Sequence, residues 1–207
     1  MANLIHQGAE AKIYRTAWKN RPAIIKKRLP KSYRLPEIDQ MLRRHRTRQE
    51  ALLIVEARKG GTPTPIIYDV DMATTTITME WVDGRRVKDC IDGLPEDNQR
   101  SICEHIGWGI AGLHKQEVVH GDITTSNLII AKEKVYFIDF GLGEKVDNLE
   151  KRGVDLHILL EAFTAAHAEE RLFSWVLSAY KKNVPWGKKV QHKLAEIGER
   201  GRYMERG

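Results

Sequence analysis

Two segments with oxygen-bearing side chains constrain this chain more than any other part of its sequence. Residues 120–127 read HGDITTSN, and Asp139-Phe140-Gly141 begins twelve positions after Asn127. Hard cations such as Mg²⁺ take oxygen ligands, and phosphoryl transfer needs a carboxylate that orients the acceptor. We therefore predict that Asp122 orients an acceptor and takes its proton, that the Asn127 amide oxygen holds one Mg²⁺, and that Asp139 bridges metal and phosphates.

The residues between these segments predict how they are brought together. Leu128–Ile130 and Val135–Ile138 are short apolar runs separated by a polar turn at 132–134, the pattern of a β-hairpin. A hairpin would place Asn127 and Asp139 at one end. Taken singly, an Asp after Gly and an Asn before an apolar run are ordinary turn residues, and this alternative stays open for each alone.

Two features near the N-terminus are candidates for contact with the phosphates. Ala23–Lys26 is an apolar strand that ends in a cation. Strand alternation allows only one of Lys26 and Lys27 to face the phosphates of a bound nucleotide, and Lys26 is preferred. The stretch with Gly8, Ala9, Glu10 and Ala11 precedes another strand-like run, where a phosphate-binding loop is expected. It has one glycine, so a surface turn is the competing interpretation.

A long helix is predicted from Pro36 to Lys59, because nothing breaks it until Gly60. Either Glu50 or Glu56 is expected to form an ion pair with the strand lysine, Lys26. Glu50 is preferred, because Leu42, Leu53 and Ala57 share its side of the helix. A solvated surface glutamate is the alternative.

Further elements complete the expected architecture. Residues 76–82 form a predicted strand that enters a linker at 83–84, and the backbone of Glu80 and Val82 would bind adenine in a kinase. Residues 96–115 have the apolar period of a helix with acidic residues in its first turn. Another helix is predicted to start at 153–156, where Asp155 would hydrogen-bond the backbone of 120–127 as in kinases, or would only mark a helix start.

Several stretches together carry a resemblance to a known family. QGAEAKIY, IIKKRLPKSYRLPEID, TRQEALLIVEA, HGDITTSN, IDFGL and GVDLHILLEAF closely resemble the small atypical kinase of the KEOPS (EKC) complex, the Bud-thirty-two or PRPK family. The resemblance implies an α+β, minimal bilobal protein-kinase-like fold, with a small β-rich N-lobe at about 1–82 and a mostly helical C-lobe at about 85–199. A basic tail would occupy 200–207.

The same resemblance implies an activity and partners. It points to an ATP-dependent Ser/Thr kinase and ATPase that uses ATP and Mg²⁺. It also implies the Kae-type threonylcarbamoyl-transferase and Cgi-type subunits as partners, in an assembly that makes threonylcarbamoyladenosine in tRNA.

Departures from ordinary protein kinases limit the expected chemistry. Only 16 positions separate Asp139 from Asp155, which leaves little room for a peptide-docking segment. Thr124 stands where most Ser/Thr kinases have a lysine, and losing one charge-stabilising donor typically costs about a hundredfold in rate. Slow turnover with water or the chain itself as acceptor is expected. The alternatives are a small-molecule phosphotransferase of the aminoglycoside or choline kinase type, and a non-catalytic nucleotide-binding adaptor.

Composition agrees with a single kinase-like domain of 1–207 without an appended domain. The apolar runs are shorter than the roughly 20 residues that span a bilayer, no signal pattern begins the chain, and two cysteines suit a reducing compartment. A cytoplasmic protein without membrane contact is expected, with Cys90 and Cys103 as packing residues.

Positive charge is concentrated in one segment. Between Lys26 and Arg48 there are nine basic residues against two acidic ones, a surplus of seven in a chain of net charge +6. Such a run is either a solvated face or a surface for a phosphate-rich partner. Given the resemblance, tRNA contact is expected there, through Arg43, Arg44, Arg46 and Arg48. Residues 199–207 are expected to form a flexible end, because Gly201 should interrupt a helix.

Overall fold

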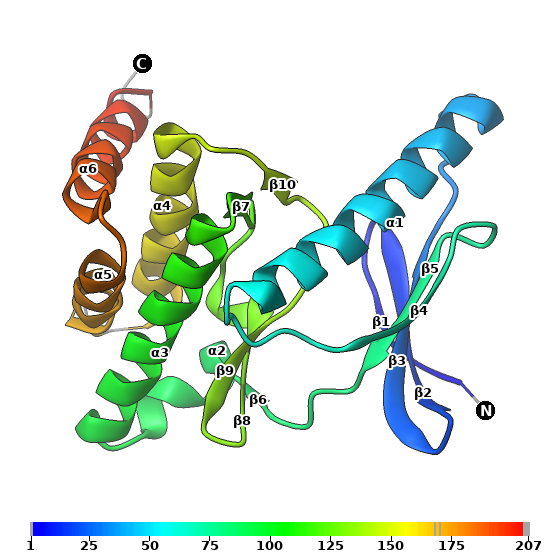
Figure 1. The fold of residues 1–207 in the computed structure, drawn as a ribbon, viewed down its shortest axis with the longest axis horizontal. Coiled ribbons are helices and arrows are strands. Elements are labelled where there is room, and N and C mark those ends of the chain that lie inside the picture. The colour runs from blue at the N-terminus through cyan, green and yellow to red at the C-terminus, as the bar shows by residue number, and fades with distance from the viewer. Residues whose placement is uncertain (1, 168, 170, 205–207) are drawn as a thin grey trace.

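Alternating side chains near the N-terminus build a five-stranded antiparallel sheet, seen on the right of Figure 1. The computed structural model describes residues 2–167, 169 and 171–204. Its first sheet contains β1 (Asn3–Gln7), β2 (Ala11–Trp18), β3 (Arg21–Arg28), β4 (Ile67–Asp71) and β5 (Thr76–Glu80), in the order β1-β2-β3-β5-β4. Lys19 and Asn20 both have positive φ in the two-residue β2–β3 turn, which suits the twist of a tight hairpin.

The predicted long helix is α1 (Pro36–Lys59), with proline in its first turn and Gly60 directly after it. Figure 1 shows α1 running obliquely between the sheet and the other lobe. Its buried side includes Glu50, Leu53 and Ala57. The expected side of the helix is therefore the one that faces the protein interior.

Two glycines bring the end of α1 close to the second lobe. A Cβ on Gly60 would lie 2.5 Å from the carbonyl oxygen of Gly112, and one on Gly112 would lie 2.6 Å from Thr62 Oγ1. Thr62 Oγ1 also donates to the carbonyl of Gly109 at 2.7 Å. The absence of side chains at 60 and 112 is what allows this close backbone packing.

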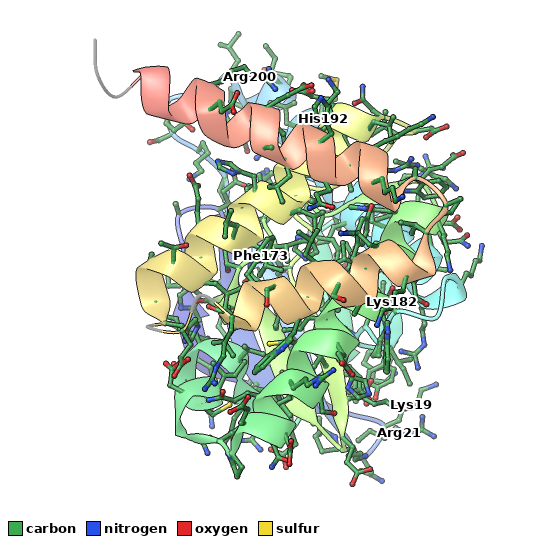
Figure 2. All side chains as sticks on the ribbon, turned by 90° about the vertical axis from the view of Figure 1, so that its left-hand side faces the viewer. Lys19, Arg21, Phe173, Lys182, His192 and Arg200 are labelled. Carbon is green, nitrogen blue, oxygen red and sulfur yellow. The ribbon has the colours of Figure 1, made fainter. Side chains whose placement is uncertain are left out.

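The second lobe is mostly helical. Its elements are β6 (Arg85–Arg86), α2 (Val87–Cys90), η1 (Ile91–Gly93), α3 (Glu96–Lys115), β7 (Val118–Val119), η2 (Thr125–Asn127), β8 (Leu128–Ala131), β9 (Lys134–Phe137), β10 (Glu144–Lys145), α4 (Leu149–Ala166), α5 (Arg171–Asn183) and α6 (Gly187–Met204). Strands β8 and β9 pair antiparallel, so the predicted hairpin is confirmed. Figure 2 shows α5, with Phe173, and α6, with His192, on the outer side of this lobe.

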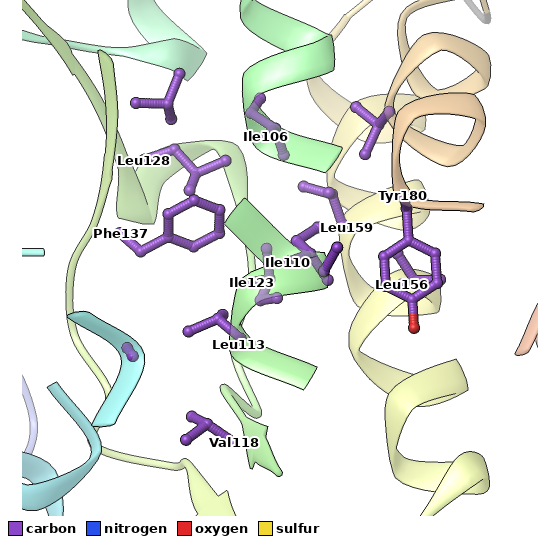
Figure 3. Close-up of a cluster of buried hydrophobic side chains, with 14 of the residues drawn as sticks. Ile106, Ile110, Leu113, Val118, Ile123, Leu128, Phe137, Leu156, Leu159 and Tyr180 are labelled. Atoms are coloured by element: carbon purple, nitrogen blue, oxygen red, sulfur yellow. The ribbon is translucent and has the colours of Figure 1, made fainter. Parts of the chain in front are cut away.

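The core of the second lobe lies around α3. Figure 3 shows Ile106, Ile110 and Leu113 of this helix between the hairpin residues Leu128 and Phe137 on one side and α4 and α5 on the other. All five side chains are fully buried. Cys90 and Cys103 are also buried and unpaired, as expected for packing residues. The core thus fixes the hairpin, and with it both ends of the segment 127–139, against the main helix.

Two boundaries differ from expectation. Helix α4 begins at Leu149, with the Asn148 side chain accepting from the Lys151 backbone N–H, so Asp155 lies inside the helix and not at its start. This asparagine cap lies five residues before Gly153, where the sequence predicted that the helix starts. The second difference is at the C-terminus. The flexible end expected from residue 199 onward is wrong as far as Met204, because α6 continues through Gly201. A glycine inside a helix costs only about 1 kcal/mol. Residues 205–207 lie outside the described part.

Among the described residues, every helix is too short or too polar to cross a lipid bilayer. The cytoplasmic location stays a prediction.

Candidate functional site

Lys26 lies at the centre of the site, on β3. Its Nζ is 2.6 Å from Glu50 Oε1 and 2.7 Å from Asp139 Oδ1. Burial alone would lower the pKa of Lys26, but the two carboxylates hold it above its ordinary value. Lys27 is exposed, as strand alternation requires. The strand, the helix and the loop after β9 therefore meet at one charged ammonium group.

Glu50 binds a second cation that the sequence did not single out. Arg28 Nη2 lies 2.6 Å from Glu50 Oε2, so each oxygen of this buried carboxylate accepts from a different cation. Arg28 is two residues after Lys26 and hence on the same face of β3, which is the signal that would have identified it. Its Nε has no hydrogen-bond partner among the described residues. Glu56, the other candidate, pairs with Lys59 and Lys145 at the surface.

Asp139 is held in an unusual backbone conformation at the end of the hairpin. Its φ is +62°, a region that Asp tolerates better than most residues. Burial raises the pKa of this carboxyl, but the adjacent Lys26 ammonium more than offsets this and holds the pKa below its ordinary value. Oδ1 also accepts from the Gly141 backbone at 3.3 Å. The carboxylate is therefore charged and directed by two donors through one oxygen.

Asp122 and Asn127 contact each other across the loop between β7 and β8. Asn127 Nδ2 donates to Asp122 Oδ2 at 3.0 Å and to the Asp122 carbonyl at 2.9 Å. The amide nitrogen thus points at Asp122, and the Asn127 Oδ1 points away from it. Partial burial is the largest influence on Asp122 and raises the pKa of its carboxyl.

The backbone of this loop is fixed by Asp155 and His120. Asp155 accepts from the N–H groups of His120 and Gly121 at 2.7 and 2.8 Å. Burial lowers the pKa of His120, and its neutral ring fits its contacts: Nε2–H donates to the Ile138 carbonyl at 3.0 Å, and Nδ1 accepts from the Asp122 N–H at 3.3 Å. His120 therefore connects the loop that carries Asp122 to the strand end that carries Asp139.

Asp155 is itself held by a buried chain of hydrogen bonds. His114 Nε2 lies 3.3 Å from Asp155, its Nδ1 lies 2.8 Å from the Tyr180 hydroxyl, and Trp186 Nε1 donates to that hydroxyl at 3.3 Å. Burial lowers the pKa of His114, so a neutral ring bridges α5 and α4. None of the three residues that extend this chain from Asp155 was identified from the sequence, because they come from separate parts of the fold.

The predicted phosphate loop borders a pocket of about 380 Å³. The pocket is lined by His6, Gly8, Ala9, Glu10, Ala11, Ile13, Lys26, Arg28, Asp122, Asp139, Gly141 and Leu142. Glu10 accepts from Arg46 of α1 and from Arg28 at 3.3 Å, and Lys31 donates to the Ala9 carbonyl. Side chains, and not extra glycines, hold this loop in place.

Glu80 and Val82 are not among the residues that line this pocket. Glu80 ends β5 beside Ala23 of β3, its N–H donates to the Ile66 carbonyl at 2.8 Å, and Val82 is buried in the connection to β6. Glu50 and Asn127 do not line the pocket either, but they hydrogen-bond to Lys26 and Asp122, which do. The adenine contact stays a prediction.

The donors available at this site fit a magnesium-chelated triphosphate. Within the described residues, Asp122 Oδ1, Asn127 Oδ1 and Asp139 Oδ2 have no hydrogen bond, because the other polar atom of each side chain makes the contacts. Mg²⁺ is usually held by one or two carboxylates together with water and substrate phosphates. The described residues contain no cluster of three or more His, Cys, Asp or Glu for a metal held by protein alone. The donor set thus suits a metal that arrives with phosphates.

Much of the basic charge between Lys26 and Arg48 is neutralised internally. Arg34 and Arg43 pair with Asp39, and Arg46 pairs with Glu10. Together with the buried Lys26 and Arg28, these pairs leave Lys27, Arg44 and Arg48 exposed without an ion pair among the described residues. The surface that faces solvent is less basic than the sequence suggested.

Comparison with known proteins finds a kinase domain and similarity to KEOPS complex subunits. Residues 8–165 match the protein kinase domain. The chain is 42% identical to the KEOPS complex subunit Bud32 of Pyrococcus abyssi, over 98% of this chain and 97% of that protein. It is 37% identical to the mouse EKC/KEOPS complex subunit Tp53rkb, over 96% of this chain and 86% of that protein.

A longer relative shows the same similarity over only part of its length. A probable bifunctional tRNA threonylcarbamoyladenosine biosynthesis protein of Methanothermobacter thermautotrophicus is 43% identical over 98% of this chain, which spans 37% of that protein.

Proposed function

The chain belongs to the protein kinase family, among the relatives of the KEOPS subunit Bud32, and we propose that it is a slow Mg-ATP-dependent ATPase and Ser/Thr kinase of a KEOPS-type complex. The observation that carries this proposal is that Lys26, Asp122 and Asp139 line one pocket. Glu50 contacts Lys26 and Asn127 contacts Asp122, although neither lines the pocket itself. On this proposal the assembly contains a Kae-type threonylcarbamoyl-transferase and a Cgi-type subunit, and modifies tRNA in the cytoplasm.

We assign the residues roles that follow from their free atoms. Lys26, charged and held by Glu50, contacts the phosphates, and Arg28 adds a second positive charge beside it. Asn127 Oδ1 and Asp139 Oδ2 would hold Mg²⁺, which when bound would offset the negative charge of the transferred phosphoryl group. The loop of Gly8, Ala9, Glu10 and Ala11 covers the phosphates, and the backbone of Glu80 and Val82 binds adenine.

Asp122 orients the acceptor oxygen through its free Oδ1. Burial raises the pKa of Asp122, which makes its carboxylate a better proton acceptor than an exposed aspartate. The acceptor is water or a hydroxyl of the chain or its complex, because only a short connection separates the Asp139-Phe140-Gly141 turn from α4 at Leu149. Thr124 contributes no cation, which supports slow transfer.

The test is to incubate the chain with labelled ATP and Mg²⁺, and to measure phosphate release and protein labelling separately. The assay is run with the chain alone and with KEOPS-type subunits and tRNA. We expect partners to increase phosphate release more than labelling. Asp122→Asn should abolish both signals, whereas Asp69→Asn, at an exposed position of β4, should leave them unchanged.

Three results would contradict this proposal. Unchanged phosphate release by Asp122→Asn would support a nucleotide-binding adaptor. Efficient transfer to sugars, amines or aminoglycosides would support a small-molecule phosphotransferase. Labelling of generic peptides by the isolated chain at about 1 to 100 per second would indicate an ordinary protein kinase.

A further inference from the structure

A buried histidine outside the loop that carries Asp122 and Asn127 contacts that loop at a residue that Asp155 does not bind. His167 directly follows the last residue of α4. Its Nδ1 lies 2.8 Å from Asp92 Oδ2 of η1, and its Nε2 lies 3.3 Å from Thr125 Oγ1. The His167 side chain is fully buried, whereas Asp92 is half exposed. The three residues come from distant parts of the sequence, and the proposed chemistry uses none of them.

His167 joins Asp92 and Thr125 through its two ring nitrogens. Asp92 is a carboxylate acceptor, so the Nδ1 of His167 carries a proton and donates to it. The opposite nitrogen, Nε2, makes a hydrogen bond with the Thr125 hydroxyl, which is able both to donate and to accept. This arrangement fixes the hydroxyl of Thr125, which is itself almost fully buried.

Thr125 is two residues from the predicted metal ligand. It begins η2, the short 3₁₀ turn that ends at Asn127. The Asn127 N–H closes this turn by donating to the Thr124 carbonyl at 2.9 Å. Holding the Thr125 side chain therefore holds the turn that directs Asn127 toward Asp122.

Helix α4 thus contacts the loop of residues 120–127 at two places. Asp155, in its second turn, binds the backbone of His120 and Gly121. His167, just past its end, binds Thr125. Twelve residues separate the two anchors, a distance of about 18 Å along a helix. One rigid element accordingly sets the position of both the Asp122 end and the Asn127 end of the loop.

We propose that His167, oriented by Asp92, is a positioning residue that fixes Thr125 and thereby the metal-binding amide of Asn127. This inference rests on the proposed Mg-ATP chemistry. His167 also packs against Phe163, with ring centroids 5.4 Å apart, so a role in packing alone must be distinguished from positioning.

Two substitutions at His167 separate these roles. In His167→Asn the amide takes the place of Nδ1, so the hydrogen bond with Asp92 is kept and the one with Thr125 is removed. In His167→Gln the longer amide reaches the place of Nε2, so the hydrogen bond with Thr125 is kept. Both replace the ring by an amide, and both remove the packing against Phe163. A packing role predicts equal effects, whereas positioning predicts a larger effect of His167→Asn.

The measurement is the rate of ATP hydrolysis as a function of Mg²⁺ concentration, with the unfolding midpoint of each variant. For His167→Asn we expect about a tenfold loss in kcat or in apparent Mg²⁺ affinity, the range for groups that support metal ligands. His167→Gln should lose less. Thr125→Val should match His167→Asn, and the double variant should be no worse than either, because both remove one hydrogen bond.

Asp92→Asn provides an independent variant at a half-exposed position, and its unfolding midpoint should stay close to that of the wild type. It should shift the Mg²⁺ dependence in the same direction by a smaller factor. Wild-type kinetics in Asp92→Asn and Thr125→Val, or equal losses in both His167 variants, would overturn the inference.

The comparison of wild type with Asp122→Asn tests the proposed function separately. If that pair shows no difference in hydrolysis, the proposed function fails. If it differs while the His167 set does not, only the positioning role fails.

Discussion

Glu50 holds Arg28 with the carboxylate oxygen that Lys26 does not use, at 2.6 Å in both contacts. One buried negative charge is therefore shared by two buried positive charges on β3. Asp139 and Glu10 supply the remaining negative charge, each from a more exposed position. The site accordingly depends on Glu50 for its stability as well as for the position of Lys26.

The first prediction concerns the removal of this charge. Glu50→Gln keeps the shape of the side chain but leaves two buried cations without their main partner. Breaking a buried ion pair in this way typically costs about 3 to 5 kcal/mol. Denaturant unfolding should show a loss of this size in the free energy of unfolding. Glu56→Gln on the same helix, whose partners are at the surface, is the control and should cost far less; equal losses would contradict the account.

The second prediction concerns stability in mild acid. Burial lowers the pKa of both His114 and His120 from the ordinary value of 6.5. Below that value the unfolded chain binds protons that the folded chain does not, so folding stability falls as the pH decreases. The slope is at most about 1.4 kcal/mol per pH unit for each histidine.

Urea unfolding at a series of pH values between about 7.5 and 5 tests this prediction. The slope of the free energy of unfolding should become smaller in His114→Gln and in His120→Gln. Slopes equal to that of the wild type in both variants would show that these two rings are not neutral in the folded protein.

The third prediction concerns the contact between α1 and the second lobe. Gly60 has φ −75°, a value that alanine adopts freely, but its Cβ would lie 2.5 Å from the Gly112 carbonyl oxygen. Gly60→Ala should cost about 1 to 3 kcal/mol through overpacking. Gly93→Ala is the matched control, because nothing lies within 4 Å of its Cβ position. A thermal unfolding midpoint that is the same for both variants would show that the lobes do not pack so closely.

Local pattern was enough to predict much of this architecture. The bounds of α1 and α3 follow from proline at or before the first turn and from apolar periodicity, and the hairpin β8–β9 follows from two apolar runs around a polar turn. Alternation along β3 predicted that only one of Lys26 and Lys27 faces inward, and the preferred Lys26 is the buried one. These features depend on residues close together in the sequence, which is why the sequence alone indicates them.

Contacts between distant segments were not predictable in the same way. The chain Trp186–Tyr180–His114–Asp155 joins three helices, and His167 meets Asp92 and Thr125 only in the folded protein. A single histidine on a helix carries no signal of its partner. The expected break in α6 failed for a different reason: a glycine weakens a long helix by less than is needed to end it.

The fourth prediction concerns tRNA. Arg44 and Arg48 are exposed on α1, whereas Arg43 and Arg46 are paired with Asp39 and Glu10. If α1 binds tRNA, Arg44→Ala with Arg48→Ala should reduce the salt dependence of binding by about 0.9 in log–log slope for each phosphate that the variant no longer neutralises. The double variant of Arg43 and Arg46 should change the slope less. An identical slope in all three proteins would exclude this surface.

The central claim is that Lys26 and the free oxygens of Asn127 and Asp139 hold a magnesium-chelated triphosphate. Calorimetric titration of ATP, with Mg²⁺ and with excess EDTA, measures this directly in the wild type, Lys26→Met and Lys27→Met. We predict that EDTA weakens binding in the wild type by at least about tenfold, since metal and carboxylates neutralise each other's charge. Lys26→Met should weaken Mg-ATP binding, and Lys27→Met should not. ATP binding that is indifferent to Mg²⁺, or that responds equally to both lysine substitutions, would contradict the account.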